Sequence, residues 1–113
     1  MNKKGLTTVI IIILVILLAT FILNRSTSND ISEKVAKCIG EKAILYIQLG
    51  CHACEIQEET FGEYYKHLTV VDCFFDREEC LKGNIEATPT WVINGGKYKG
   101  AHSIDKLKEL TGC

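Results

Sequence analysis

The sequence predicts a small α/β domain with a central mixed sheet, preceded by one transmembrane helix. Two observations lead to this class: an uncharged apolar run near the amino end, and after it an alternation of periodicities in the order α, β, α, β, α, β, β, α. The 113 residues leave room for one compact domain beyond the run. We expect an anchor at 1–24, a linker at 25–30 and the globular domain at 31–113.

The apolar run, LTTVIIIILVILLATFIL, covers 18 residues (6–23) without a charge. As a helix it would be about 27 Å long, close to the hydrocarbon thickness of a bilayer. Lys3 and Lys4 before it favour a cytoplasmic amino terminus, which makes this a single-pass protein of the cell membrane with an extracytoplasmic domain. The alternative is a signal peptide cleaved near the small residues at 26–28, but the run is longer than a signal peptide needs.

Charge and cysteine content narrow the function. From Asp30 onward the chain carries 10 Lys/Arg and 14 Asp/Glu, a formal charge of −4, which argues against nucleic-acid binding through a basic patch. All six cysteines follow the apolar run, a high content for 84 residues. An oxidising compartment would let them pair, and their pairing stays open at this point.

The first helix and strand of the domain have local signals. Asp30 and Glu33 stand at capping-box spacing, and Gly40 suits a left-handed stop, so we expect a helix over 31–39. The segment AILYIQL (43–49) is almost continuously apolar, as expected for a central strand covered on both faces.

After Gly50 the apolar period becomes helical, which places Cys51 at or just before a helix amino terminus. The apolar face of this helix is expected to comprise Ala53, Ile56, Phe61 and Tyr64. A strand at 68–76 and a short helix in REECLKGN follow. Strand, helix and strand form a βαβ unit, whose two strands would run parallel.

The last third predicts a hairpin and a closing helix. Asn94-Gly95 is a strong hairpin signal between TWVI (90–93) and KYKGA (97–101), which would be antiparallel. Ser103 can cap a final helix that Gly112 ends.

The pair Cys51 and Cys54 in CHAC, at the start of a helix that follows a central strand, resembles the Cys-x-x-Cys motif of the thioredoxin fold. The resemblance covers about residues 31–113. Pro89 in ATPTW stands where thioredoxin-like proteins carry a cis-proline facing the dithiol. The resemblance implies that a substrate segment lies beside this loop and pairs with the backbone of Thr88 by strand addition.

A second resemblance is carried by AKCIGEKA, VDC, EEC and ATPTWVINGGKYKGAHSIDKLKELTGC. These segments are similar to the thioredoxin-like domain that is fused to, or works beside, bacterial-type homologues of vitamin K epoxide reductase. Two positions depart from thioredoxin itself: His52-Ala53 lacks the proline common in the motif, and Leu45 stands in place of a buried acid behind the dithiol. The second departure argues against efficient proton removal from Cys54, and hence against a thioredoxin-like reducing role.

Position assigns the two thiols their chemistry. A helix amino terminus stabilises a thiolate, so the pKa of Cys51 should lie below the roughly 8.5 of a free cysteine, and Cys51 is the expected nucleophile. Cys54, one turn inside the helix, is the expected resolving thiol. His52 would add positive charge near the sulfur and tune the pKa, whereas Glu55 and Glu58 would oppose it.

The pair Cys51 and Cys54 also allows other interpretations. Cys51 and Cys54 could form a structural disulfide, or half of a zinc site with Cys73 and Cys80, but the six residues between the latter two exceed the usual spacing of roughly two to four. We therefore expect no metal site.

For the accessory cysteines we expect structural disulfides. Cys73–Cys80 would fix the exit of the second strand, with a second redox pair as the alternative. Cys38–Cys113 would tie the two ends of the domain together, with free or intermolecular thiols as the alternative.

Two aromatic residues and two histidines are expected to have structural or surface positions and no role in the site. Trp91 and Tyr98 are expected in the core and hairpin, and His67 and His102 on the surface.

The sequence therefore favours a membrane-tethered thiol–disulfide oxidoreductase that donates disulfides to secreted or membrane proteins and needs no small cofactor. The resemblance implies a vitamin K epoxide reductase-like membrane oxidase as the partner that reoxidises Cys51–Cys54 and passes electrons to a quinone. The alternatives are a tethered thiol reductase of the cytochrome-maturation type and a metal-binding or structural module.

Overall fold

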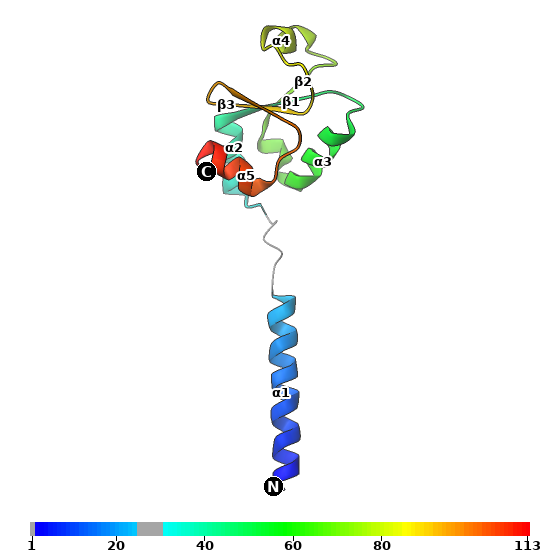
Figure 1. Ribbon diagram of the computed structural model, residues 1–113, viewed down its shortest axis with the longest axis vertical. Helices are drawn as coiled ribbons and strands as arrows, with labels where there is room; N and C mark the ends of the chain where they lie inside the picture. The colour runs from blue at the N-terminus through cyan, green and yellow to red at the C-terminus, as the bar shows by residue number, and fades with distance from the viewer. Residues whose placement is uncertain (1, 25–30) are drawn as a thin grey trace. The chain divides into compact units, whose positions relative to one another are not determined.

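The computed structural model describes residues 2–24 and 31–113, and its contacts divide the chain into two units that meet between Asp30 and Ile31. The predicted linker, the cleavage residues at 26–28 and the capping residue Asp30 lie outside the described residues. In chain order the elements are α1 (Lys3–Leu23), α2 (Glu33–Lys42), β1 (Ala43–Ile47), α3 (His52–Phe61), the 3-10 helix η1 (Gly62–His67), β2 (Thr69–Asp72), α4 (Arg77–Lys82), β3 (Thr90–Ile93), β4 (Gly96–Lys99) and α5 (Ile104–Thr111) (Figure 1).

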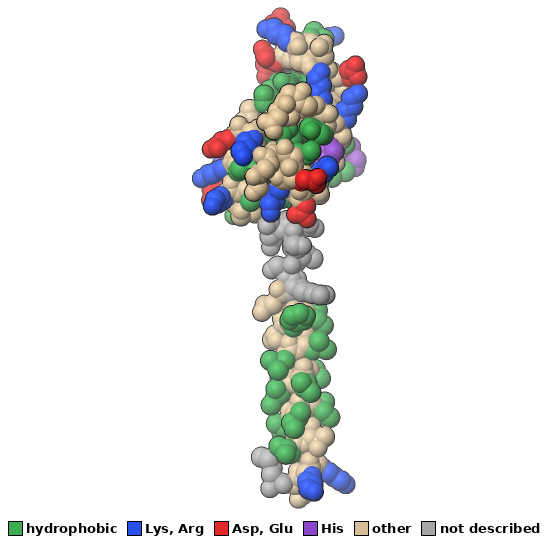
Figure 2. Space-filling model, turned by 60° about the vertical axis from the view of Figure 1, so that its left-hand side comes forward, with side chains coloured by type: hydrophobic (Ala, Val, Ile, Leu, Met, Phe, Trp, Pro, Cys, Tyr) green, Lys and Arg blue, Asp and Glu red, His purple; other side chains and the backbone are tan. Residues whose placement is uncertain are grey.

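Helix α1 contains the whole apolar run. It has 21 residues, and its most apolar 18-residue stretch has a mean hydropathy of 3.2, so its length and composition allow it to span a membrane, as those of a signal sequence would. Apolar side chains follow the helix along its length, and lysines stand at its amino end (Figure 2). The threonine hydroxyls of Thr7 and Thr8 donate to the carbonyls one turn earlier, at 2.8 and 2.9 Å, and so need no water.

The second unit is built on a four-stranded mixed sheet in the order β2-β1-β3-β4. β1 runs parallel to β2 and antiparallel to β3, and β3 forms an antiparallel hairpin with β4. Helices α2 and α5 pack side by side next to the sheet, and α4 lies beside the end of β2 (Figure 1). The predicted fold class is confirmed: the arrangement is consistent with a thioredoxin-like fold preceded by one apolar helix.

A single core holds this unit together. Trp91 is fully buried, as expected, and its ring lies 5.9 Å from that of Phe61, centroid to centroid. The buried apolar residues of the core are Ala36, Ile39, Ala43, Leu45, Phe61, Trp91, Ile93 and Leu107. They come from α2, β1, α3, β3 and α5, so every long element of the unit contributes to one core.

The hairpin and closing helix follow their local signals. Asn94 and Gly95 both have positive φ, 50° and 78°, as a two-residue turn of the mirror-image type requires. The hydroxyl of Ser103 accepts from the Lys106 N–H at 3.2 Å, and Gly112, with φ of 76°, ends α5 in the left-handed conformation. The strands are shorter than expected: β1 ends at Ile47 and β2 covers only Thr69–Asp72.

The prediction for α2 was wrong at both ends. Ser32 caps it by accepting from the Val35 N–H at 3.3 Å, and the helix continues through Gly40 to Lys42. Glycine is needed at position 40 because the backbones of α2 and η1 approach each other closely there, and not because the helix ends in a left-handed conformation. A Cβ there would clash with the His67 carbonyl, and the hydroxyl of Thr69 donates to the Gly40 carbonyl at 2.7 Å.

The face expected for α3 was also partly wrong. Gly62, with φ of 55°, ends the helix after Phe61, so Tyr64 belongs to η1. Ile56 is 45% exposed, whereas Gln57 is fully buried. A hydrogen-bonded polar side chain has taken the interior position, which apolar periodicity does not reveal.

The two histidines are less exposed than expected of surface residues. The Nε2 atom of His67 lies 3.0 Å from Oε1 of Glu33, and only 18% of its side chain is exposed. Lys37, above all, and His67 lower the pKa of the Glu33 carboxyl. His102 is half-buried, with its Nε2 3.1 Å from the Lys99 carbonyl oxygen.

Replacing Gly40 by Ala tests the close approach of α2 to η1. An exposed helix position would gain up to about 1 kcal/mol from this change. Here we expect the free energy of unfolding to fall by roughly 1–3 kcal/mol because the Cβ forces the two backbones apart. Urea unfolding of the full chain in detergent micelles, followed by the fluorescence of its single tryptophan, measures this. Glu41→Ala, an exposed change in the same helix, should alter stability by less than about 0.5 kcal/mol. A stabilised Gly40→Ala variant would contradict the packing described here.

Candidate active site around Cys51 and Cys54

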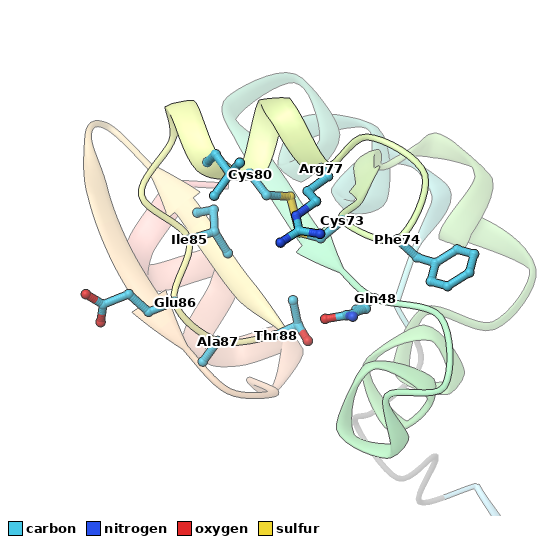
Figure 3. A pocket seen from close by; sticks show the side chains of 10 residues that line it. Gln48, Cys73, Phe74, Arg77, Cys80, Ile85, Glu86, Ala87 and Thr88 are labelled. Carbon is cyan, nitrogen blue, oxygen red and sulfur yellow. A yellow bond between two sulfur atoms is a disulfide. The ribbon is translucent and has the colours of Figure 1, made fainter.

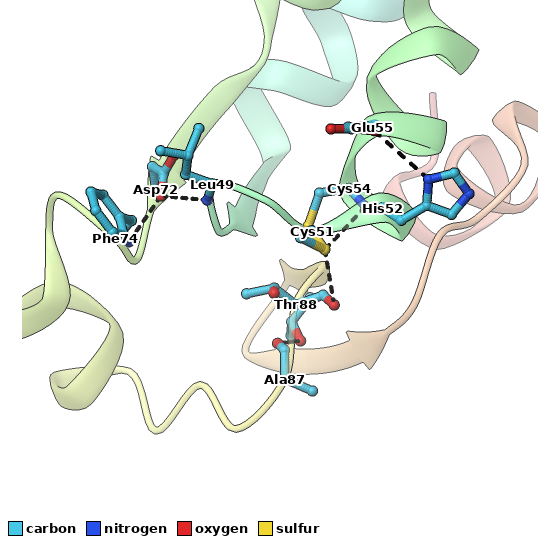
Figure 4. Close-up of a disulfide and its surroundings, with 10 residues drawn as sticks. Leu49, Cys51, His52, Cys54, Glu55, Asp72, Phe74, Ala87 and Thr88 are labelled. Carbon is cyan, nitrogen blue, oxygen red and sulfur yellow. Dashed lines mark hydrogen bonds and ion pairs between the residues drawn. A yellow bond between two sulfur atoms is a disulfide. The ribbon is translucent and has the colours of Figure 1, made fainter.

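A tight turn joins β1 to α3 and fixes the position of Cys51. The Cys51 N–H donates to the Gln48 carbonyl at 3.0 Å, and Gly50 adopts a φ of 83°, which favours glycine. The carboxylate of Asp72, at the end of β2, accepts from the Leu49 N–H at 3.2 Å (Figure 4). The turn is therefore held both from within and from the neighbouring strand.

Cys51 is the N-cap residue of α3. Its Sγ accepts from the Cys54 N–H at 3.2 Å, which occupies one of the backbone donors left unpaired at a helix start. The two sulfurs are joined in a disulfide, with Cα atoms 5.2 Å apart. Cys51 is half-buried and Cys54 only 5% exposed, so an incoming sulfur reaches Cys51 first.

The loop before β3 meets the disulfide. The Thr88–Pro89 peptide bond is cis, and the Thr88 carbonyl oxygen lies 3.5 Å from Sγ of Cys51 (Figure 4). Two hydrogen bonds hold the loop: the Thr90 hydroxyl donates to the Ala87 carbonyl at 2.6 Å, and the Gly100 N–H donates to the Pro89 carbonyl at 2.8 Å. Within residues 2–24 and 31–113, nothing accepts from the Thr88 N–H.

The imidazole of His52 turns away from the disulfide (Figure 4). Its side chain is 88% exposed, and Nδ1 lies 3.7 Å from Oε2 of Glu55. His52 makes no contact with the sulfurs, so any effect on them acts through space.

Gln57, which the apolar periodicity of the sequence did not reveal, joins α3 to β3 and to the segment after β4. Its Oε1 accepts from the Trp91 indole N–H at 2.9 Å and from the His102 N–H at 2.7 Å, and its Nε2 donates to the His102 carbonyl at 3.0 Å. All polar atoms of a fully buried amide thus have partners. Gln57 lies about one turn after Cys54 in α3. These bonds therefore help to fix the position of the dithiol relative to the Thr88–Pro89 loop.

The 3-10 helix η1 contains a tyrosine, Tyr65, whose hydroxyl is buried. Burial, and to a lesser extent the nearby carboxylates of Glu58 and Asp72, raise the pKa of Tyr65 to about 12. Its hydroxyl oxygen is buried and has no hydrogen-bond partner in the described part of the chain. Tyr65 therefore stays protonated at neutral pH and adds no charge near the dithiol.

The structure joins the four accessory cysteines in pairs. Cys38 is bonded to Cys113, with Cα atoms 6.0 Å apart, which links α2 to the end of α5. Cys73 is bonded to Cys80, with Cα atoms 5.7 Å apart, which closes the loop between β2 and α4. In the described ranges no three His, Cys, Asp or Glu side chains group in a way that could hold a metal ion.

A pocket of about 500 Å³ opens between the Cys73–Cys80 loop and the segment that leads to Thr88 (Figure 3). Arg77 and the Cys73–Cys80 disulfide stand on one side of it, and Ile85, Ala87 and Thr88 on the other. Thr88 lines this pocket, and its carbonyl oxygen lies 3.5 Å from the Cys51 sulfur, so one residue separates the pocket from the dithiol.

Comparison with known proteins agrees with a dithiol site. No protein-family model matches the chain. The chain is similar to the thiol-disulfide oxidoreductase LTO1 of Arabidopsis thaliana, with 36% identity over 83 residues. The match covers 66% of this chain and 22% of LTO1, so the chain spans less than a quarter of that protein. The similarity, together with the Cys51–Cys54 pair, supports a role in disulfide exchange.

Replacing Gln57 by Ala tests its role as a tie. The change leaves the Trp91 indole and both backbone groups of His102 buried without their partner, so we expect the free energy of unfolding to fall by roughly 2–3 kcal/mol. Urea unfolding under non-reducing conditions measures it. Glu59→Ala, an exposed change in the same helix, is the control and should be near neutral. Equal stabilities of the two variants would show that the amide contributes nothing to the tie.

Proposed function

We propose that this chain is a membrane-anchored, extracytoplasmic thiol–disulfide oxidoreductase in which Cys51 is the nucleophile and Cys54 the resolving thiol. One observation carries the proposal: the half-buried Cys51 caps α3 beside the Thr88–Pro89 loop, while its partner Cys54 is buried. The similarity to a thiol-disulfide oxidoreductase supports the same chemistry.

The reactivity of Cys51 follows from the helix end. A thiolate at this position accepts the Cys54 N–H, which already lies 3.2 Å from the sulfur, and faces the positive end of the helix dipole. Both effects stabilise the reduced pair, and a stabilised reduced form makes the disulfide more oxidising. His52 would add to this effect through its charge when protonated, and Glu55 opposes it.

Disulfide transfer then proceeds in two exchange steps. A substrate thiolate attacks Sγ of Cys51, forming a mixed disulfide and releasing Cys54 as a thiolate. A second substrate thiolate attacks the substrate sulfur of that mixed disulfide and releases Cys51. The substrate loses two electrons and two protons, and the protein gains them as the Cys51/Cys54 dithiol.

Substrate segments would bind by strand addition at the loop before β3. The Thr88 N–H has no partner within the described residues, and Glu86 and Ala87 beside it are exposed. An extended substrate can pair with this backbone, which would bring a substrate cysteine next to Cys51.

Membrane attachment through α1 would place the domain outside the cytoplasm, with Lys3 and Lys4 inside. A vitamin K epoxide reductase-like oxidase in the same membrane would accept the two electrons from Cys51/Cys54 and pass them to a quinone. This partner rests on the sequence resemblance described above.

Single cysteine replacements test the two roles. With the full chain in detergent micelles, Cys51→Ser should abolish oxidation of a dithiol peptide. The remaining sulfur of the pair, Cys54, is buried and has lost its disulfide partner. Cys54→Ser should instead accumulate a mixed disulfide through Cys51, detected by mass spectrometry. The double variant Cys38→Ser/Cys113→Ser, which removes a disulfide outside the pocket beside Thr88, serves as the control and should retain exchange. Activity in Cys51→Ser would exclude the proposed nucleophile.

A redox titration tests the direction of transfer. In glutathione buffers of graded ratio, we expect two thiols, Cys51 and Cys54, to appear between about −120 and −230 mV, while the other four cysteines stay paired. Alkylation followed by mass spectrometry counts them. If the pair stays oxidised down to about −270 mV or lower, the protein is a reductant or a structural module, and the disulfide-donating role fails.

A further inference from the structure

The pocket beside Thr88 contains a positively charged side chain, Arg77, that has no role in the exchange reaction. One wall is the segment from Ile85 to Thr88, and the other is the loop and helix closed by the Cys73–Cys80 disulfide. The Ile85 N–H donates to the Cys80 carbonyl at 2.9 Å, which joins the two walls at one end. The pocket therefore adjoins Thr88, the residue beside which a substrate backbone would lie.

Arg77 is the cation of this pocket. Its guanidinium points into the space between the walls (Figure 3), and no carboxylate in the described part of the chain pairs with it. Two of the nearby acids are engaged with lysines: Glu86 turns outward and lies 3.0 Å from Nζ of Lys99, and Glu79 lies 3.8 Å from Nζ of Lys82. The sequence neighbours of Arg77, Asp76 and Glu78, are exposed and do not line the pocket. An occupant of the pocket thus meets an unpaired positive charge.

The rest of the lining is mixed: Gln48, Glu86 and Thr88 are polar, and two large apolar side chains are exposed beside them. Phe74 and Leu81, which also line the pocket, are 58% and 65% exposed. Such side chains contact the aliphatic stems and backbone of an extended peptide well, but they give no selectivity among charged residues. A peptide with only apolar side chains would cover Arg77 and leave its charge unpaired, which is unfavourable.

We propose that this pocket binds the substrate segment next to the reacting cysteine, and that Arg77 selects protein substrates with an Asp or Glu close to that cysteine. The inference rests on the exchange function proposed above. The wall from Thr88 back to Ile85 is four residues long. Because an extended substrate runs residue by residue beside this wall, the acid lies within about four residues of the cysteine.

The preference runs against the overall charge of the domain. From Asp30 onward the chain has a formal charge of −4, so long-range electrostatics disfavours acidic substrates. The attraction between Arg77 and a substrate carboxylate therefore has to exceed the repulsion from the net negative charge of the domain. The pair also adds geometric specificity, because a guanidinium binds a carboxylate with two parallel hydrogen bonds.

The test uses the full chain carrying Cys54→Ser, in detergent micelles, with Cys51 held as a mixed disulfide with thionitrobenzoate. The substrates are a set of ten-residue peptides with one central cysteine. Each peptide carries a single Asp, Asn or Lys at one of the four positions before or the four positions after that cysteine. Attack of the peptide thiolate on Sγ of Cys51 releases the coloured thiolate. Each rate is divided by the rate of the same variant with β-mercaptoethanol, which reports the reactivity of Cys51 alone.

We expect Asp to exceed Asn by about three- to ten-fold at one or two positions, with Lys slower than Asn. Arg77→Gln should bring the Asp/Asn ratio close to one, and Arg77→Glu should invert it. Lys82→Gln removes the same charge from the same helix but does not line the pocket, and it should keep the ratio of the parent. Comparing identical peptides across variants cancels the effect of the acid on the peptide thiol itself.

Three results would overturn the inference: no Asp preference in the parent, an unchanged preference in Arg77→Gln, or an equal loss in Lys82→Gln, which would indicate only long-range charge. Failure of β-mercaptoethanol to release thionitrobenzoate is a separate result. It would show that Cys51 is inaccessible and would reject the exchange function itself.

Discussion

The antiparallel pairing of β1 with β3 is the constraint on which the candidate site depends. Tyr46 pairs with Thr90 near the end of this ladder, so the carboxyl end of β1 and the amino end of β3 meet at one edge of the sheet. β1 continues there into the turn that carries Cys51, and β3 is preceded there by Thr88 and Pro89. The 3.5 Å between the Cys51 sulfur and the Thr88 carbonyl oxygen is a result of strand register, and a shift of one residue would separate the two groups.

A second tie fixes the helix that follows. Strand register places Cys51, but the direction of α3 decides whether the first turn of the helix points its N–H groups at the sulfur. Gln57 joins α3 to β3 through Trp91 and to the segment after β4 through His102. Asp72 holds the turn from the side of β2 through the Leu49 N–H. Three strands thus act on one helix start, which keeps the Cys51 sulfur in place in a domain with a small core.

The parts of the structure that sequence predicted are those with local causes. The Asn94-Gly95 turn requires positive φ at both residues, and the cap at Ser103 requires a hydroxyl three residues before a free N–H; both signals lie within the element they define. Gly40 misled the prediction for α2 because its reason is the backbone of η1, which lies 27 residues later. Gln57 was missed for a similar cause: periodicity counts apolar residues, whereas this amide is buried because its partners on two distant segments satisfy it. Arg77 is unpaired partly because Glu79 pairs with Lys82 and Glu86 pairs with Lys99. The pair between Glu86 and Lys99 joins two segments that only the folded chain brings together.

Helix ends distinguish Cys51 from the other five cysteines. Cys51 alone stands at the start of a helix, where backbone N–H groups and the dipole favour a thiolate. Cys38 lies in the second half of α2, and Cys113 follows the end of α5, where unpaired carbonyls and the negative end of the dipole disfavour one. Cys80 and Cys54 are shielded by burial, with 6% and 5% exposure. Cys73 precedes α4 in a loop closed by its own disulfide, and a thiolate released there gains no helix N-terminus. Of the three disulfides, Cys51–Cys54 therefore combines an accessible sulfur with a helix end that stabilises the same sulfur as a thiolate, whereas the sulfurs of the other two lack this combination.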